Sequence, residues 1–142
     1  MAKIKLEIVS PDSVVYTTDI SMLIVRSTGG ELGILPQHAP LVTGLIPHAM
    51  RVKIDEQEEL VAVSGGFMEV QPDKITVLAT AAELPIHIDI NRAKQAYARA
   101  QERLDAFHKE VPPRTDIDWK HAQAALDRAK ARLIATRTSL DK

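Results

Sequence analysis

The sequence has 142 residues, enough for one domain or two small ones, and its formal net charge of −1 gives no argument for binding nucleic acid or a charged membrane surface. It contains no cysteine, which excludes disulfides, thiolate catalysis and cysteine-ligated zinc, and its 4% aromatic content against 45% hydrophobic residues predicts an aliphatic core. The N-terminus alternates charged and apolar residues, and no run approaches the ~20 apolar residues of a membrane span, so we expect neither a signal peptide nor a spanning segment. We therefore expect a soluble, intracellular chain that reaches a membrane only through a partner.

The first part of the chain, residues 1–84, has the hydrophobic period of β-strands. Apolar side chains occupy alternate positions in residues 4–8 and again in residues 50–54. Further β-rich runs lie around residues 14–16, 22–24, 60–63, 66–70 and 75–79, and turn residues separate them at 11–13, 55–58 and 72–73. Short strands at close spacing with turns between them predict a β-sandwich or a flattened barrel.

Residues 29–42 are the most distinctive stretch, because three glycines, two prolines, Glu31 and His38 fall within it. Glycine permits positive φ and close backbone approach, whereas proline fixes φ and lacks an N–H donor. We therefore expect a loop of defined shape between strands, of a kind that often binds a partner. Taken singly, His38 is more typical of a surface or turn residue than of a ligand, and Glu31 is typical of a solvated loop charge. A second glycine pair, Gly65–Gly66, opens another strand.

The second part of the chain has a helical period, with apolar residues every three or four positions. One apolar stripe runs from Ala93 to Phe107, and a second runs from Trp119, a predicted packing anchor, to Leu133. Tandem prolines in residues 111–116 require a connection there, and Asp116 or Asp118 can cap the second helix. The pattern predicts an antiparallel two-helix hairpin. Its alanine-rich seams bury little apolar area, so we expect the hairpin to be weakly held and able to rearrange.

No catalytic or metal-binding motif is evident in the sequence. No two of the five histidines have the i, i+4 spacing of a helical zinc site, and there is no Gly-x-x-x-x-Gly-Lys-Ser/Thr phosphate loop. We therefore expect no catalytic residue and no metal site. The competing interpretation is a small enzyme with an unrecognised site in the glycine-rich loop.

Charged residues gather where the two parts of the chain meet. Asp89 can cap the first helix, and Arg92 can pair with Glu83 or Asp89 at the surface. Five arginines form two rows on the predicted helices, namely Arg92, Arg99 and Arg103 on the first and Arg128 and Arg132 on the second. If the helices fold together, these rows can converge on a phosphate, while Glu83 or Asp89 accepts from an adenine amino group or a ribose hydroxyl. The alternative is that the arginines are an ordinary solvated face.

Four ordered segments, residues 9–11, 30–41, 64–70 and 72–79, followed by the helical hairpin, resemble the epsilon-subunit family of bacterial F-type (F1Fo) ATP synthases. The resemblance implies an α+β fold in two domains, with an N-terminal ten-stranded β-sandwich at 1–84 and a C-terminal antiparallel two-helix hairpin at 88–142. It implies a non-catalytic central-stalk subunit of the proton-translocating enzyme, whose catalytic sites are on other chains. Such a subunit is peripheral to the cytoplasmic side of the bacterial cell membrane and is held there through the complex.

The resemblance also implies partners. They are the gamma subunit, the c-ring of Fo, and the alpha and beta subunits when the hairpin is extended, with no nucleic acid among them. The family's sandwich contacts gamma and the c-ring, and its glycine–proline loop faces the ring. The implied c-ring contacts are Glu31, Leu32, Gly33, Ile34 and His38. The family's helical domain inhibits ATP hydrolysis when it extends along gamma and permits hydrolysis when it folds down beside the sandwich.

Some bacterial members bind ATP in the folded-down form through the motif Ile/Leu-Asp-x-x-Arg-Ala, which residues 88–93 match. The implied regulatory ATP site consists of Glu83, Ile88, Asp89, Arg92, Ala93, Arg99, Arg128 and Arg132, and no cofactor is required. His121 stands where some ATP binders carry arginine. The alternative function is a stand-alone ATP-sensing module that is not part of a rotary ATPase.

Overall fold

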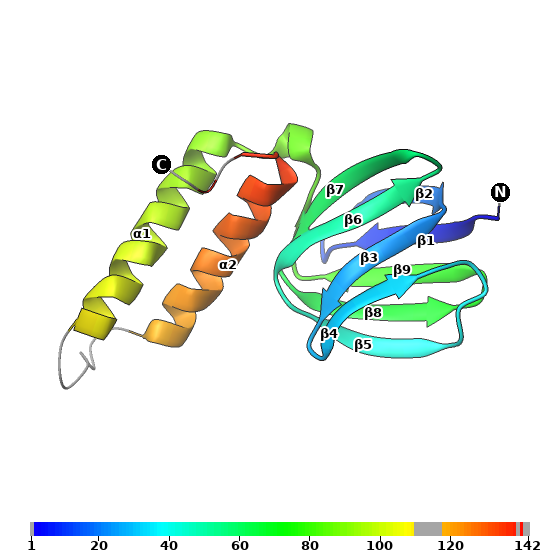
Figure 1. Ribbon diagram of the computed structural model, residues 1–142, viewed down its shortest axis with the longest axis horizontal. Helices are drawn as coiled ribbons and strands as arrows, with labels where there is room; N and C mark the ends of the chain where they lie inside the picture. The colour runs from blue at the N-terminus through cyan, green and yellow to red at the C-terminus, as the bar shows by residue number, and fades with distance from the viewer. Residues whose placement is uncertain (1, 110–117, 139, 141–142) are drawn as a thin grey trace.

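The computed structural model describes residues 2–109, 118–138 and 140, and it consists of a β-rich part followed by two helices (Figure 1). The described strands are β1 (Ile4–Val9), β2 (Val14–Ile20), β3 (Met22–Ser27), β4 (Gly30–Ile34), β5 (Leu41–Leu45), β6 (His48–Ile54), β7 (Gln57–Val63), β8 (Gly66–Gln71), β9 (Lys74–Ala79) and β10 (Ala82–Glu83). A short 3₁₀ turn, η1 (Pro85–His87), leads to α1 (Ile90–Lys109) and α2 (Trp119–Ala135). The predicted ten-stranded sandwich with a C-terminal two-helix hairpin is confirmed.

The strands form one continuous sheet that folds over into two layers (Figure 1). Their order is β10-β7-β6-β3-β5-β8-β9-β1-β2, and β4 pairs with β3 outside this path. Neighbours are antiparallel except for β1 and β9, which run parallel with Leu6 opposite Ile75. The apolar faces of the two layers meet inside the sandwich.

Alternation in the sequence correctly predicts which side chains face the core. Ile4, Leu6 and Ile8 of β1 are at most 1% exposed, whereas the intervening Lys5 is exposed. Strand β7 differs, because all residues of its second half are buried. Val61 packs in the sandwich core, while Leu60 and Ala62, on the other face of the strand, pack against the helices. The continuous apolar run at 60–63 therefore marks the strand on which the hairpin docks.

Gly66 occupies a position that no other residue fits. Its φ is +138°, and a Cβ built there would lie 2.1 Å from the carbonyl oxygen of Leu78 on β9. The prediction that a glycine pair opens this strand is correct, since β8 begins at Gly66. Positive φ and the close approach of β9 together require glycine.

The glycine–proline stretch is less of a loop than its composition predicts. Its first part is β4, which pairs with β3 so that Glu31 lies opposite Arg26. Only residues 35–40 form a loop, in which Gln37 has a φ of 67° and its N–H donates to the carbonyl oxygen of Pro72 at 2.9 Å. The expectation of a single loop over residues 29–42 was wrong, because the β3 edge offers pairing partners to residues 30–34.

Both helices begin with an aspartate cap. The Asp89 Oδ1 accepts from the Arg92 N–H at 3.0 Å, and the Asp118 Oδ1 accepts from the His121 N–H at 3.1 Å. These contacts confirm the predicted cap of α1 and select Asp118 for α2. The alternative cap, Asp116, and the predicted connection over residues 111–116 lie outside the described residues.

The seam between the helices is narrow and rich in alanine. Its buried cluster consists of Ala100, Leu104, Ala122 and Leu126. Trp119 is 42% exposed, so the expectation of a packing anchor is only partly met. Its ring centroid lies 6.3 Å from that of Phe107 at the end of the hairpin farther from the sandwich.

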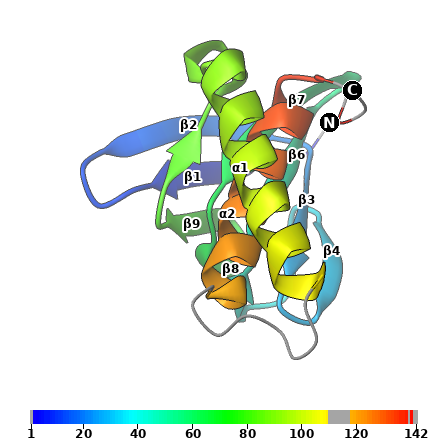
Figure 2. The ribbon, with the colours of Figure 1, turned by 90° about the vertical axis from the view of Figure 1, so that its left-hand side faces the viewer.

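Helix α2 lies between α1 and the sandwich and packs on β6 and β7 (Figures 1 and 2). The docking contact is a buried cluster of Leu60, Ala62, Ile88, Ala93, Ala131, Leu133 and Ala135. Four of these seven side chains are alanines, so the contact buries little apolar area for its length. The hairpin is folded down beside the sandwich through a small interface.

Candidate functional site

The charged residues at the junction surround a polar hollow of about 450 Å³ beside the start of α1 and the end of α2. Its lining consists of Glu83, His87, Asp89, Arg92, Ala93, Gln95, Ala96, Arg99 and Arg132. Six of the eight residues predicted for ATP binding are therefore brought together, all except Ile88 and Arg128. They come from β10, the segment before α1, and both helices.

An ion pair closes one side of the hollow. The Arg132 Nε donates to the Glu83 Oε1 at 2.6 Å, joining the end of α2 to β10. Both side chains are about one third exposed, at 29% and 32%. Within the described residues, Glu83 pairs with Arg132 rather than with Arg92, which was the partner that the sequence indicated.

Asp89 is already engaged at the start of α1. Its carboxylate accepts from the backbone N–H of Arg92, and its carbonyl oxygen accepts from the Ala93 N–H at 3.0 Å. These bonds fix the first turn of the helix, so they set the direction in which the Arg92 side chain projects from it. Asp89 thus has a structural role here whether or not a ligand is present.

Three guanidinium groups line the hollow. Arg92 and Arg99 are exposed and lie two helical turns apart on α1, and Arg132 reaches the hollow from α2. Against them stand the two carboxylates of Glu83 and Asp89, so positive charge is in excess. Converging guanidinium groups of this kind can hold phosphate oxygens through paired N–H donors.

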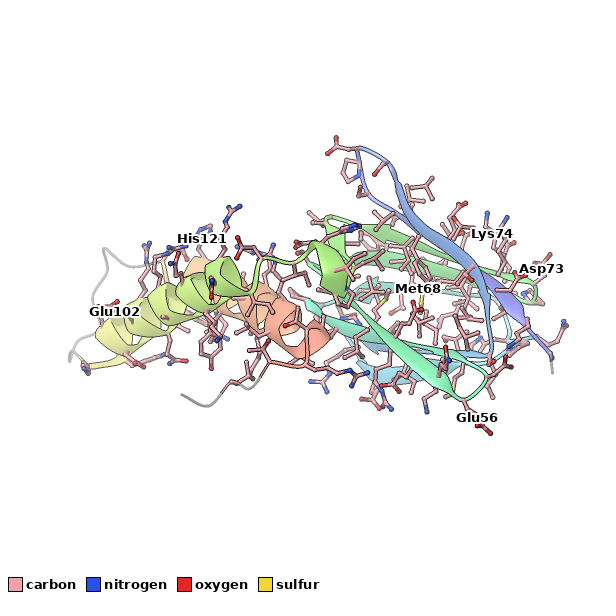
Figure 3. All side chains as sticks on the ribbon, turned by 90° about the horizontal axis from the view of Figure 1, so that it is seen from above. Glu56, Met68, Asp73, Lys74, Glu102 and His121 are labelled. Carbon is pink, nitrogen blue, oxygen red and sulfur yellow. The ribbon has the colours of Figure 1, made fainter. Side chains whose placement is uncertain are left out.

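Two of the predicted residues lie elsewhere. Ile88 is only 8% exposed and belongs to the apolar docking cluster, so its side chain packs against the sandwich side of the hairpin instead of lining the hollow. Arg128, half-buried one turn before Arg132 on α2, is absent from the described lining. His121 is exposed near the start of α2, and Figure 3 labels it on the hairpin.

The sequence reasoning missed three lining residues, His87, Gln95 and Ala96. Gln95 and Ala96 follow Arg92 by three and four positions, so helical periodicity could have found them. His87 enters the site because the 3₁₀ turn after Leu84 folds the chain back, with the His87 N–H donating to the Leu84 carbonyl at 2.9 Å. Pro85 was the available signal for that turn.

The predicted c-ring contacts lie on and just after β4. The Glu31 side chain is 62% exposed and faces the Arg26 guanidinium at a loose 3.9 Å. Leu32 is half-buried against the core and Gly33 is exposed. Ile34 is 0% exposed within the sandwich core, so its side chain cannot meet a partner, because the strand alternation turns it inward.

The loop after β4 provides the exposed apolar side chain that Ile34 does not. Leu35 presents a 55% exposed apolar side chain immediately after Ile34. His38, which is half-buried, has its Nδ1 2.6 Å from the Ala39 carbonyl oxygen, a distance at which the ring nitrogen donates. The exposed residues of this segment are Gly30, Glu31, Gly33, Leu35, Gln37, Ala39 and Pro40, and Leu35 is the large apolar side chain among them.

A stripe of exposed apolar side chains crosses one outer face of the sandwich. Val42 is 69% exposed, Phe67 61% and Leu78 54%. Phe67 lies directly opposite Leu78 on β9 and opposite Gly44 on β5, two residues after Val42. Leu78 in turn lies beside Val9 of β1, which is paired with the 58% exposed Val14 of β2. We call the four exposed residues Val42, Phe67, Leu78 and Val14, together with the half-buried Val9, the apolar stripe.

The described part of the chain contains no group of three or more histidine, cysteine, aspartate or glutamate side chains placed to hold a metal ion. None of its helices is long and apolar enough to cross a membrane.

Two solved assemblies contain chains of the same fold. A chain of the Euglena gracilis mitochondrial ATP synthase superposes with a TM-score of 0.77 at 21% identity, over 96% of this chain and 82% of that one. A chain of the Tetrahymena thermophila mitochondrial ATP synthase gives a TM-score of 0.58 at 11% identity, over 95% and 97%. At these identities the similarity shows the fold alone.

Sequence similarity identifies the family as well as the fold. The family model for the ATP synthase delta/epsilon chain β-sandwich domain matches residues 3–85, and the model for its long α-helix domain matches residues 87–137. The ATP synthase epsilon chain of Bacillus licheniformis is 50% identical over 137 residues, which cover 96% of this chain and 100% of that protein. That of Alkalihalophilus pseudofirmus is 48% identical over 136 residues, or 96% and 98% of the two chains. The chain therefore belongs to the ATP synthase delta/epsilon family, and within it to the epsilon chains.

Proposed function

We propose that this epsilon chain couples the rotating stalk to the membrane ring through its sandwich and restrains ATP hydrolysis through its hairpin. The observation that carries the proposal is the unequal construction of the two parts, a densely packed sandwich and a hairpin held by a small alanine-rich contact. The chain itself is non-catalytic, and the catalytic sites are on other chains of the complex. It reaches the cytoplasmic side of a bacterial cell membrane only through that complex.

Inhibition follows from the reach of the hairpin. Helix α1 has 20 residues and is about 30 Å long at ~1.5 Å per residue. If it detached and extended along gamma, its arginines would reach the alpha and beta subunits, where a rigid rod would obstruct rotation. A complex whose epsilon chain lacks residues 88–142 should assemble normally and hydrolyse ATP faster. Hydrolysis that is no faster in the truncated complex would contradict the braking role.

The sandwich offers one surface for each of its two proposed neighbours. We assign the apolar stripe to gamma, because a contiguous apolar surface on a soluble domain usually marks a protein interface. We assign Glu31, Gly33, Leu35 and His38 to the c-ring, where Glu31, only loosely paired with Arg26, is free to meet a basic group. Both solved structures of similar fold are of assemblies that include a c-ring.

Two variants, each with a matched control, separate these surfaces. Phe67→Asp should abolish co-purification with gamma, whereas Ile86→Asp, at an 85% exposed position outside the stripe, should not. Glu31→Lys combined with His38→Ala should weaken attachment to the ring and leave gamma binding intact, with Glu56→Lys in a distant turn as the control. Equal effects of Phe67→Asp and Ile86→Asp would remove the stripe from the interface.

We further propose that ATP stabilises the folded-down hairpin by binding in the polar hollow. Support comes from the donors of α1 and α2, which share the hollow only while the hairpin is folded, so ATP has a differential affinity for the two states. A ligand at a hundredfold excess over its dissociation constant stabilises the state it binds by about 2.7 kcal/mol. Arg92, Arg99 and Arg132 are assigned to the phosphates, and Glu83 and Asp89 to the adenosine or to holding the arginines.

Binding and capping can be distinguished at Asp89. Asp89→Ser retains a helix cap but is too short to reach a ligand, so it should lose the ATP-induced rise in melting temperature without unfolding α1. Arg99→Gln should likewise lose the shift, whereas Arg103→Gln, one turn further along α1 and outside the described lining, should keep it. No heat and no thermal shift at millimolar ATP would leave these residues as a helix cap and a surface ion pair.

The alternative of a stand-alone ATP sensor is not favoured, because the similarity to ATP synthase epsilon chains spans both the sandwich and the helices. Co-purification with the whole complex is the direct test. A chain that does not co-purify with gamma would favour the stand-alone ATP sensor instead.

A further inference from the structure

A histidine that the sequence analysis did not single out lies beneath the docked hairpin. His48 begins β6 and lines a crevice of about 260 Å³ whose other walls come from β3, β4 and α2. Ala131 and Ile134 of α2 cover the crevice from the helical side. The surroundings of this imidazole therefore depend on whether the hairpin is docked.

Both ring nitrogens of His48 have defined partners. The Nδ1 lies 2.6 Å from the carbonyl oxygen of Ile46, so it carries the proton and donates. The Nε2 accepts from the backbone N–H of Arg26 at 3.0 Å. Only the neutral imidazole with its proton on Nδ1 satisfies both bonds. Protonation would set an Nε2–H against the Arg26 N–H and break the bond that ties the start of β6 to β3.

The charges around His48 offer little compensation for an imidazolium. Arg26 comes from β3, Glu31 from β4, and Asp127 and Lys130 from α2, while β7 places the uncharged Val63 opposite His48. Glu31 pairs loosely with Arg26 at 3.9 Å and the Asp127 Oδ1 accepts from the Gln123 Nε2 at 3.0 Å, and within the described residues neither carboxylate forms an ion pair with His48. Burial lowers the pKa of His48, the Ile46 bond raises it, and the Arg26 charge lowers it further.

We propose that His48 is an acid-sensitive latch, whose neutral imidazole permits α2 to dock on the sandwich and whose protonation favours the undocked hairpin. The proposal concerns the chain by itself and does not depend on the braking function proposed above. If that function also holds, acidification would release the hairpin independently of ATP.

The direction of the effect follows from linkage. Docking covers the imidazole and disfavours its charged form, so His48 binds its proton less tightly when the hairpin is docked. Docking is therefore most favourable above the pKa that His48 has in the undocked chain and weakens as the pH falls below that pKa, until the docked form is protonated too. Each unit by which docking lowers the pKa corresponds to a tenfold loss in the ratio of docked to undocked hairpin.

The absence of native cysteine permits a direct measurement on the full chain. Spin labels at Glu56→Cys on the sandwich and Glu102→Cys on α1, both exposed and well separated (Figure 3), report docking as a distance distribution. We expect the distance that characterises the docked hairpin to lose population between pH 7.5 and pH 5. His48→Gln should remove this dependence, while His121→Gln, at an exposed histidine of α2, should retain it.

A second measurement protects the test against misfolding of the variant. NMR titration of the unsubstituted chain should show His48 with a pKa below 6.5, and that pKa should rise toward 6.5 when Ala135→Gln forces a bulky side chain into the docking contact. A docked population that does not change with pH would overturn the proposal. So would an equal loss of docking in the His48→Gln chain, or a His48 pKa that ignores the hairpin.

Discussion

The sandwich and the hairpin are stabilised by different kinds of buried side chains. The sandwich buries branched side chains such as Ile8, Leu23 and Ile75 to 0% exposure between two layers of one continuous sheet. The hairpin encloses two alanines and two leucines in its buried seam and docks through a cluster in which four of seven side chains are alanines. The sandwich is therefore a rigid platform, while the hairpin makes contacts that are small enough to be exchanged for different ones.

The two parts meet on β7, where a single strand serves both. Its Val61 belongs to the sandwich core and its Leu60 to the docking cluster. The surface of β7 on which the hairpin packs therefore stays formed when the hairpin undocks. The predictions below test whether the parts are as unequal as this arrangement implies.

The largest effect is expected inside the sandwich at Gly66. Gly66→Ala should lower the free energy of unfolding by about 4 kcal/mol, because the new methyl group would overlap the Leu78 carbonyl in addition to straining φ. The control is Gly30→Ala, which has a similar φ of +124° but no atom within 4 Å of the added Cβ. Its cost should be about 1 kcal/mol, from backbone strain alone. Equal losses in urea denaturation would show that close approach is not the reason for glycine at this position.

The next effect compares the two cores directly. Leu23→Ala in the sandwich should cost about 3 kcal/mol and accelerate hydrogen exchange throughout the chain. Leu126→Ala in the helix seam should cost about 2 kcal/mol and accelerate exchange only in the helices. If the seam variant opened the sandwich amides to the same extent, the two parts would form a single cooperative unit.

A smaller effect is expected at the ion pair that joins the parts. Arg132→Gln should weaken docking by about 1 kcal/mol, since the pair with Glu83 is partly exposed and therefore screened. Its counterpart within the sandwich is Arg51→Gln, which removes a pair to Glu58 of 2.9 Å. That variant should leave hairpin docking unchanged in the spin-label measurement. A loss of docking in both variants would point to a general destabilisation.

The smallest effect is acid sensitivity within the sandwich. Arg51 donates two hydrogen bonds to Glu58 and holds the pKa of that carboxyl below its ordinary 4.5. The pair therefore stabilises the fold above pH 4.5, and this contribution is lost as the pH falls through the lowered pKa. Glu58→Gln should flatten part of the decline in unfolding free energy below pH 4.5, and Glu56→Gln in the neighbouring turn should not. Parallel acid curves for the two variants would contradict the assignment.

Local patterns predicted much of this architecture because strand and helix periods are properties of short segments. The alternation in residues 4–8 identified the inward face of β1, and tandem prolines separated two helical stripes. The pattern failed where pairing was non-local. Composition indicated a loop at residues 30–34, but the edge of β3 turns them into a strand and sends Ile34 into the core.

At the junction, local sequence specifies which charges are available, because the motif at 88–93 and Glu83 are local, and the capping role of Asp89 follows from its place before a helix. Tertiary packing sets the rest: Arg132 pairs with Glu83, Arg128 does not line the hollow, and His48 shares a crevice with α2. The physical reason is that helix rotation and docking position depend on packing between residues far apart in the chain. A shift of one position on α2 exchanges the side chains that meet the sandwich, and no local propensity encodes that choice.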